Sequence, residues 1–293
     1  MSERRGPTIR RRRLGNELRR HRDAAGITIE AVAEKLECSA SKISRIETGH
    51  TTASPRDVRD MLLIYGLSAA ESEELVQIAR EARQKGWWHP YSKVLAGSYV
   101  GLESAANSMR TYEQQVVPGL LETEAYASAM IRAARPDIEP DQVTQRVRVR
   151  INRQSLLTQE DPVDLWVVLD EAVLHRPVGG DAVMRGQLRR LVEVAELPNV
   201  TLQILPFAVG AHAGMDGTFT ILSFPEAGDP DVVYAENATG GLFLEKSDEL
   251  QKYNFIFDHI RAAATRPEDS IAQIAELAEE PLWNWRPRGS MGT

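Results

Sequence analysis

Five short segments with helical spacing fill the first 84 residues of this 293-residue chain. The first begins near Ile9, and the second and third follow Thr28 and Ser39, whose hydroxyls can accept hydrogen bonds from the free amides of a helix N-terminus. Such short segments are stable only when their apolar faces pack on one another, so they predict one small all-α module. The remaining two segments are Pro55–Tyr65 and Ala69–Gln84.

Further along the chain the period of the apolar residues changes from helical to alternating. Residues 102–134 and 142–157 still have helical spacing, and further helices are expected at 182–197, 247–264 and 270–279. Four β-branched or aromatic runs between them have the character of strands, namely Leu165–Leu169, Val200–Leu205, Thr218–Phe224 and Val232–Ala235. The C-terminal part is therefore predicted to be an α+β domain with a small mixed sheet.

The predicted organisation is multidomain. The chain is about twice the usual domain length, and glycine, proline and clustered aromatic residues interrupt the helical pattern at 86–100. The expected parts are a basic arm at 1–13, a five-helix domain at 14–85, a linker at 86–100, an α+β domain at 101–285 and a tail at 286–293. No apolar run approaches the length of a membrane span, and we expect a cytoplasmic protein.

The charge of the chain is unevenly distributed. Residues 1–60 hold 14 Lys and Arg against 9 Asp and Glu, whereas the rest holds 21 against 33, which makes the overall net charge −7. Nine arginines fall within the first 22 residues. A basic end of this kind attracts a phosphate backbone, although a solvated charge run is the alternative. The only cysteine is Cys38, which excludes an intramolecular disulfide and a cysteine-based zinc cluster.

The second and third segments meet the requirements of a helix-turn-helix. Ala33 is a small residue where the two helices cross, Glu37 to Ser39 forms a tight turn, and Ile43 and Ile46 lie on the inner face of the third helix. The stretch TIEAVAEKLECSASKISRIETG, residues 28–49, resembles the xenobiotic-response-element type of helix-turn-helix, the family that includes phage repressors. The resemblance implies a sequence-specific transcriptional regulator that binds double-stranded DNA.

The same resemblance implies a role for individual side chains. Positions that present side chains to base edges in such repressors correspond here to Ala40, Ser41, Lys42, Ser44 and Arg45. Arginine can make a bidentate pair with guanine, serine can donate to or accept from several bases, and alanine offers a methyl contact to thymine.

Phosphate contacts and one internal ion pair also follow from the resemblance. Thr28, the amide of Ile29 and Arg56 correspond to the family's phosphate anchors, and Arg22 and Glu47 to a partly buried ion pair between helices 1 and 3. Two residues depart from the pattern, because Glu37 replaces the usual turn glycine and Ile29 a common glutamine. The arm is expected either to contact the DNA backbone or to form a disordered tail, and its candidate contacts are Arg10, Arg11, Arg12 and Arg13.

The C-terminal part resembles the second domain of a large family of antitoxin-like regulators from filamentous soil bacteria. The resemblance rests on residues 99–131, on LPNVTLQILPF and GTFTILSFP, and above all on VPGLLET at 117–123. It implies control by a small partner protein, whereas a domain that binds a small metabolite is the alternative. Inverted half-sites in DNA further imply a homodimer. Its interface is expected in the C-terminal domain, either near Trp87–Trp88 or along residues 247–264.

Enzymatic and metal-binding readings of the C-terminal domain are weaker. Glu171 and His175 are four residues apart, and His212, Asp216 and Glu236 occur in the strand region, but no nucleophile motif or complete ligand set accompanies them. The glycine pairs at 179–180 and 240–241 lack a phosphate-loop pattern and are interpreted as turns. We therefore expect no enzyme, no metal and no cofactor.

Overall fold

Side-chain caps define the helices of the N-terminal part in the computed structural model, which describes residues 7–83, 97–225, 229–237 and 240–279. Thr28, Ser39, Ser54 and Ser68 each accept a hydrogen bond from a backbone amide in the first turn of the helix that follows. Each cap satisfies one of the free amides of a helix N-terminus. The five helices are α1 (Pro7–Ala24), α2 (Ile29–Lys35), α3 (Ala40–Glu47), α4 (Pro55–Ile64) and α5 (Ala69–Glu81).

The basic arm differs from expectation. Residues 7–13 form the first two turns of α1, so the arginine run is not a separate extended segment. Arg10 pairs with Glu81 at 3.1 Å and Arg13 with Glu74 at 3.4 Å, both on α5. Opposite charge on a neighbouring helix explains why the helical pattern extends through this basic stretch. Residues 1–6 lie outside the described residues.

Helix α1 crosses α3 at very short range. A Cβ atom added at Gly15 would lie 2.5 Å from the carbonyl oxygen of Glu47 and 2.7 Å from that of Ile46, so the crossing requires glycine. About two turns further along α1, the Arg22 guanidinium donates to both carboxylate oxygens of Glu47, at 2.7 and 2.9 Å. Both side chains are buried. Close backbone contact and a bidentate ion pair together fix α3 against α1.

A mixed six-stranded sheet organises the C-terminal part, in the order β3-β2-β1-β4-β5-β6. Strands β1, β2 and β3 are parallel, and β4, β5 and β6 follow antiparallel to their neighbours. The predicted fold class, an all-α domain followed by an α+β domain with a mixed sheet, is confirmed. The strands are β1 (Ser108–Glu113), β2 (Asp164–Asp170), β3 (Val200–Leu205), β4 (Phe219–Ser223), β5 (Val232–Asn237) and β6 (Gly240–Leu244).

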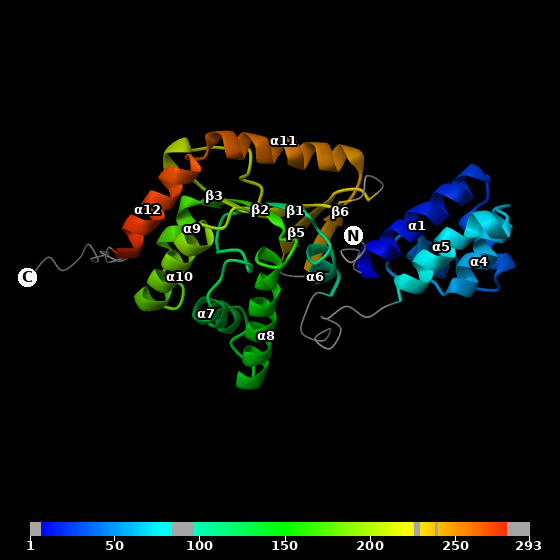
Figure 1. The fold of residues 1–293 in the computed structure, drawn as a ribbon, viewed down its shortest axis with the longest axis horizontal. Coiled ribbons are helices and arrows are strands. Elements are labelled where there is room, and N and C mark those ends of the chain that lie inside the picture. Colours follow the sequence, from blue (N-terminus) through cyan, green and yellow to red (C-terminus); the bar gives the residue numbers. More distant parts are fainter. Residues whose placement is uncertain (1–6, 84–96, 226–228, 238–239, 280–293) are drawn as a thin grey trace, which may run out of the picture. The chain divides into compact units, whose positions relative to one another are not determined.

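Helices cover both faces of this sheet (Figure 1). On one face, α11 packs Ile256, Phe257 and Ile260 against strand residues that include Tyr112 and Phe219. Figure 1 shows α7, α8 and α10 on the opposite side. The helices are α6 (Gly97–Glu103), α7 (Glu124–Ala134), α8 (Pro140–Arg153), α9 (Glu171–His175), α10 (Asp181–Val194), α11 (Ser247–Ala263) and α12 (Pro267–Glu279), with short 3-10 turns at Gln154–Leu157 and Phe207–Val209.

Two strands were not expected from the sequence. The prediction of helical structure over 102–134, broken at Pro118–Gly119, is wrong at β1. There the sequence SMRTYE has no β-branched run but is paired on both sides, by β2 and β4. Pairing between distant strands outweighs local propensity there. Strand β6 begins with Gly240 and Gly241, and the interpretation of these glycines as a turn is wrong because they pair with β5. Gly179 does precede a helix as part of a turn.

The chain divides into two compact units at a different place from the predicted linker. One unit comprises residues 1–106 with 224–230, and the other comprises 107–223 with 231–293. Residues 97–103, assigned to the linker and the start of the second domain, form α6 in the first unit. Residues 84–96, with Trp87–Trp88, and residues 280–293, with the predicted tail, lie outside the described residues.

Buried polar side chains hold the VPGLLET loop, residues 117–123, in place. The Gln187 side chain donates to the carbonyl of Leu121 and accepts from the amide of Thr123, both at 2.7 Å. Glu122, also buried, accepts from the Arg150 guanidinium at 2.6 and 2.7 Å. The two Gln187 bonds fix the backbone of the loop and the Arg150 ion pair holds the Glu122 side chain, which gives the signature a structural explanation.

A largely enclosed carboxyl group lies close to this loop. Burial raises the pKa of Glu113, the last residue of β1, from its usual 4.5 to about 8, and the negative charges of Glu236 and Glu122 act in the same direction. The hydroxyl of Thr218 opposes the shift by hydrogen bonding. At neutral pH the folded protein therefore holds a proton on Glu113 that the unfolded chain would release.

The ion pair between α1 and α3 predicts the stability of one variant. Glu47→Ala leaves the Arg22 guanidinium buried without its main partner, and we expect it to lower the free energy of unfolding of the first unit by about 3 kcal/mol. Asp23 and the carbonyl of Ile27 still accept from Arg22, which keeps the loss near the lower end of the usual range. Urea unfolding followed by circular dichroism measures it. Glu73→Ala, which removes an exposed ion pair with Arg80, is the matched control and should cost under about 1 kcal/mol. Equal losses of unfolding free energy in Glu47→Ala and Glu73→Ala would contradict the structural role of the Arg22–Glu47 ion pair.

Glu113 predicts a pH dependence of the second unit. Because its folded pKa is raised, its contribution to stability declines between its unfolded pKa of 4.5 and its folded pKa of about 8. Glu113→Gln mimics the protonated form, and we expect it to remove a slope of about 1.4 kcal/mol per pH unit within this window. Urea unfolding at a series of pH values measures the slope. Glu160→Gln, at an exposed position of the same unit and not among the charges that act on Glu113, is the control. An unchanged slope in Glu113→Gln would refute the assignment.

Candidate nucleic-acid interface

The third helix presents two different faces. Ile43 and Ile46 are buried in the core of the first unit, whereas Ser41 and Arg45 are exposed on the outer side of α3. The Ser39 hydroxyl accepts from the amide of Lys42 at 3.2 Å and so begins the helix just before the exposed residues. Within the described part of the chain, no hydrogen bond or ion pair engages the side chain of Arg45. This face is therefore available to a ligand.

The remaining predicted base contacts are less exposed. Ala40, Lys42 and Ser44 are half-buried on α3. The Lys42 ammonium lies 3.3 Å from a carboxylate oxygen of Asp57, which belongs to the capping box of α4. Asp57 thus draws Lys42 toward α4, and a base would have to compete with this carboxylate for Lys42. The structure brings Ala40, Ser41, Ser44 and Arg45 together on one helix without such competition.

Residues assigned to phosphate lie at the beginnings of two helices. The Thr28 hydroxyl caps α2 by accepting from the amide of Ala31 at 3.2 Å, and Ile29 is the first residue of that helix. Arg56 lies in the first turn of α4, with its side chain 89% exposed, and its nearest carboxylate is that of Asp60 at 3.8 Å. The positive end of a helix dipole favours an anion at such positions.

The arginine run on α1 is less accessible than a free arm. Arg10 and Arg13 pair with α5 as described above, and all four arginines of positions 10–13 are half-buried. Burial lowers the pKa of Arg11. Arg12 passes Gly49, at the end of α3, so closely that a Cβ atom there would lie 2.9 Å from its Cγ. Contacts from these residues to a DNA backbone remain a prediction.

The turn between α2 and α3 contains a left-handed backbone conformation at Glu37, where a residue with a side chain is less stable than glycine. Glu37 adopts a left-handed conformation with φ of 50°, and no other non-glycine residue among those described has a positive φ. For a residue with a Cβ this costs roughly 1 kcal/mol. The amide of Cys38 then bonds to the carbonyl of Ala33 at 2.9 Å, which closes the turn and directs the chain into α3.

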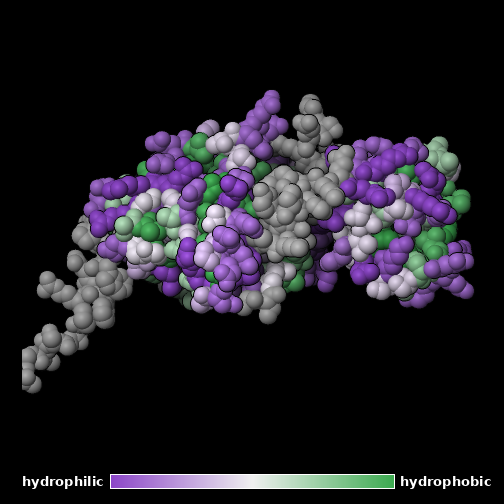
Figure 2. All heavy atoms as spheres, turned by 90° about the horizontal axis from the view of Figure 1, so that it is seen from below, coloured by the Kyte–Doolittle hydropathy of each residue, from purple (hydrophilic) through white to green (hydrophobic). Residues whose placement is uncertain are grey.

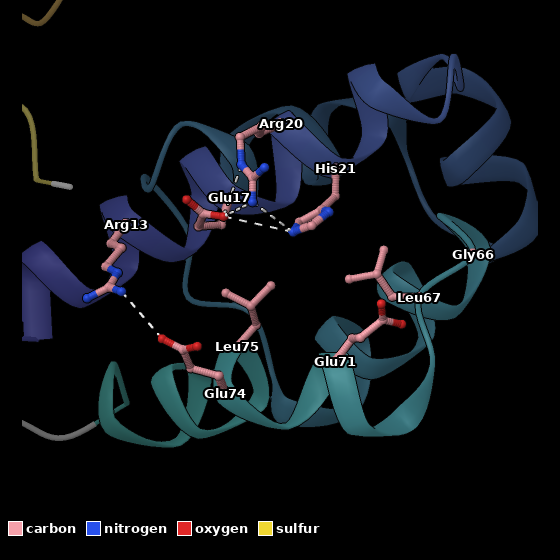
Figure 3. Close-up of a pocket in the computed structure, with 9 residues that line it drawn as sticks. All are labelled: Arg13, Glu17, Arg20, His21, Gly66, Leu67, Glu71, Glu74 and Leu75. Carbon is pink, nitrogen blue, oxygen red and sulfur yellow. Dashed lines mark hydrogen bonds and ion pairs between the residues drawn. The ribbon is translucent and has the colours of Figure 1, made fainter.

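A polar groove lies on another side of the same unit, between α1 and α5 (Figure 3). It has a volume of about 550 Å³ and contains no residue of α3. Arg20 pairs with Glu17 at 2.6 Å and Arg13 with Glu74 at 3.4 Å, so these opposite charges along its wall offset one another. The lining residues are Arg13, Glu17, Arg20, His21, Gly66, Leu67, Glu71, Glu74 and Leu75.

In the second unit the weak catalytic candidates take part in local contacts. Glu171 accepts from the amide of Phe207 at 2.7 Å and lies 3.5 Å from the His175 ring. His212 accepts from the amide of Gly214 at 3.2 Å through Nδ1, and its Nε2 lies 3.4 Å from the Tyr112 hydroxyl. These contacts connect the loops that follow the strands and account for the positions of both rings.

Sequence reasoning missed the partners of His212. Tyr112 is fully buried, and burial raises its pKa to about 12, while a carboxylate oxygen of Asp170 lies 4.0 Å from His212 Nε2. Asp170 directly follows the predicted strand at 165–169 and caps α9. A polar residue at the end of a strand is expected to lie near the ends of the neighbouring strands. Tyr112 lies on β1, a strand that the sequence did not predict, so no local pattern placed its side chain near His212. Asp216 and Glu236 are exposed and do not join this group.

The described residues include neither a candidate metal-binding cluster nor a helix suited to span a membrane. Ranges 7–83, 97–225, 229–237 and 240–279 contain no cluster of three or more histidine, cysteine, aspartate or glutamate residues suited to a metal ion. No helix in these ranges has the length and apolar character to cross a membrane.

Hydrophilic residues cover most of the visible face of each unit in Figure 2, with hydrophobic residues in scattered patches.

Comparison with known families supports the division into two parts. A model described as a helix-turn-helix domain matches residues 13–75, and this part of the chain is thus confirmed as a helix-turn-helix DNA-binding domain. A model described as a domain of unknown function, DUF5753, matches residues 96–276. No curated protein and no solved structure matches the chain significantly. Because the second match covers more than half of the chain, the protein belongs to the DUF5753 family.

Proposed function

We propose that this protein is a sequence-specific transcriptional regulator of the xenobiotic-response-element type that inserts α3 into the major groove of double-stranded DNA. The observation that carries the proposal is the pair of faces on α3, with Ile43 and Ile46 in the core and Ser41 and Arg45 exposed on the outside. A major groove is wide enough to admit one helix, whose outer side chains then contact base edges.

Each predicted base-contacting residue of α3 has a chemical role in this proposal. Arg45 makes a bidentate pair with guanine, Ser41 donates to or accepts from a base edge, and Ala40 contacts the methyl group of thymine. Ser44 and Lys42 flank them, and Lys42 reaches DNA only by leaving Asp57. Arg45 contributes most to specificity, because a bidentate pair depends on two acceptors in a fixed arrangement.

The DNA backbone is held by the beginnings of α2 and α4. Thr28, the amide of Ile29 and Arg56 contact phosphates, which fixes the register of α3 without reading sequence. Arg10 to Arg13 add long-range attraction, and two of these arginines exchange an α5 carboxylate for phosphate if they bind directly.

The regulator acts as a homodimer, and its second unit controls it. One helix-turn-helix reads few base pairs, so two copies bind inverted half-sites about one helical turn apart. The sequence resemblance to antitoxin-like regulators supports a small partner protein as the controlling input and repression as the output. We assign the α+β unit a regulatory and not an enzymatic role, in the cytoplasm. A metabolite remains the alternative input.

Arg45→Ala tests base recognition. A preferred duplex is first selected by the wild-type protein from a randomised double-stranded library, and binding to this duplex and to random duplex is then measured by fluorescence anisotropy. We expect Arg45→Ala to lose about 1 to 3 kcal/mol on the selected duplex and to lose preference at one base position. Arg80→Ala, an exposed arginine on α5, is the matched control. Equal losses on selected and random duplex would refute the role of Arg45, and no preferred duplex for the wild type would refute the proposed function.

Arg56→Ala tests the backbone contact. Removal of one phosphate contact should weaken binding to the selected and random duplexes alike and should reduce the slope of log affinity against log salt by about 0.9. The measurement is a salt titration of both duplexes between low and physiological ionic strength. Arg266→Ala, an exposed arginine in the second unit, is the control for loss of positive charge alone. A slope equal to that of the wild type would contradict the contact.

A further inference from the structure

The two edges of the six-stranded sheet differ in how their backbone groups are satisfied. On β3, the amide of Ile204 donates to the Ser270 hydroxyl at 3.0 Å, and the carbonyl of Ile204 accepts from the amide of Thr265 at 2.9 Å. Thr265 and Ser270 belong to the connection between α11 and α12 and to the start of α12. This edge is thus closed within the chain, and another strand cannot pair with it there.

The opposite edge, β6, has no corresponding cover among the described residues. Its strand partner is β5, and no residue in the described ranges bonds to its outer backbone groups. The sequence GGLFL contains no charge and no proline, the residues by which natural edge strands prevent pairing. Leu242, in the middle of β6, is 53% exposed. An uncharged edge with an exposed apolar side chain favours the addition of another strand.

The sequence of β6 is complementary to itself. In an antiparallel pair of two β6 strands centred on a two-fold axis at Leu242, this residue stands opposite its own copy. Gly241 then stands opposite Phe243, and Gly240 opposite Leu244, so that Phe243 and Leu244 each face a glycine. No like charges are opposed.

The neighbouring strand shows that β6 already accommodates a large ring beside glycine. The rings of Tyr234 and Phe243 pack with centroids 5.0 Å apart, and a Cβ atom at Gly241 would overlap the Tyr234 ring. Glycine at this position is therefore required for the close approach of the ring. A second Phe243 beside Gly241 would extend the same aromatic contact across a strand pair.

We propose that β6 pairs with β6 of a second copy of this chain, antiparallel and about a two-fold axis at Leu242, and so joins two sheets into one. The inference rests on the proposed function in one respect, because inverted DNA half-sites require a two-fold pair of subunits. The strand edge supplies the backbone hydrogen bonds of the interface, and Leu242 supplies its apolar centre. Association of this kind is isologous and ends at the dimer, because β3 is closed.

Disulfide cross-linking tests the register directly. Residues opposite each other in an antiparallel pair have Cβ atoms about 4.5 to 5.5 Å apart, close to the separation in a disulfide. The background is the full chain with Cys38→Ala, because Cys38 is its only cysteine. We expect Leu242→Cys to form a covalent dimer under mild oxidation and Phe255→Cys, which replaces an equally exposed residue of α11, to remain uncross-linked. Cross-linking of both or of neither at concentrations where the protein is dimeric would overturn the register.

A charge at the same position tests the energetics. We expect Leu242→Lys to raise the dimer dissociation constant at least about tenfold in sedimentation equilibrium, because two ammonium groups would face each other in the pair. Phe255→Lys should leave it unchanged. Circular dichroism verifies that both variants are folded. A dimer unaffected by Leu242→Lys would place the interface elsewhere, and a wild type that stays monomeric at all concentrations would mean that another segment of the chain covers β6. Either result refutes the proposal.

Binding to DNA separates this inference from the proposed function. The selected duplex is compared with a duplex that contains one half-site. If both proposals hold, Leu242→Lys binds the single half-site like the wild type but loses the extra affinity for the pair. If Leu242→Lys remains a dimer and binds the selected duplex like the wild type, only the β6 interface is refuted. A covalent Leu242→Cys dimer without preference for any duplex refutes only the DNA-reading function.

Discussion

The orientation of α3 depends on how closely α1 can cross it. At Gly15 the two backbones approach so closely that any side chain would collide with the carbonyls of Ile46 and Glu47. The ion pair between Arg22 and Glu47 then holds the same two helices at a second point. Two points of attachment determine a rotation as well as a distance, so the outer face of α3 keeps one direction. A larger residue at Gly15 would displace α3 from α1 and turn Ser41 and Arg45 together away from their present direction.

Signals that act over a few residues predicted most of the fold. Thr28 and Ser39 cap the helices that follow them, and the β-branched runs on β2, β3 and β5 are strands. The misses depend on partners far away in the chain. Strand β1 is stabilised by two neighbouring strands, and the turns of α1 at 7–13 lie beside acidic residues of α5. The candidate DNA contacts came from the resemblance of residues 28–49 to a known helix-turn-helix family, whereas Tyr112 and Asp170 lie near His212 only through the topology of the sheet.

Positive charge in the sequence overstates the positive charge that the N-terminal unit can offer to a phosphate. Arg10 and Arg13 are partly neutralised by α5, and Lys42 by Asp57. Each of these groups must exchange one oxyanion for another, so the gain in electrostatic energy is smaller than for a free cation. Arg56, with its side chain 89% exposed, keeps more of its charge available. A few well-placed groups at helix beginnings therefore determine more of the phosphate affinity than the number of arginines indicates.

The length of α3 has a consequence for how folding and recognition are connected. The helix has only eight residues, and isolated helices shorter than about 12 to 15 residues are barely stable in water. Its reading surface exists only while the rest of the first unit holds it. DNA that binds this surface binds the folded state alone, so its presence must raise the melting temperature of the unit by mass action. Conversely, any input from the second unit that loosens this small core would release DNA without touching α3.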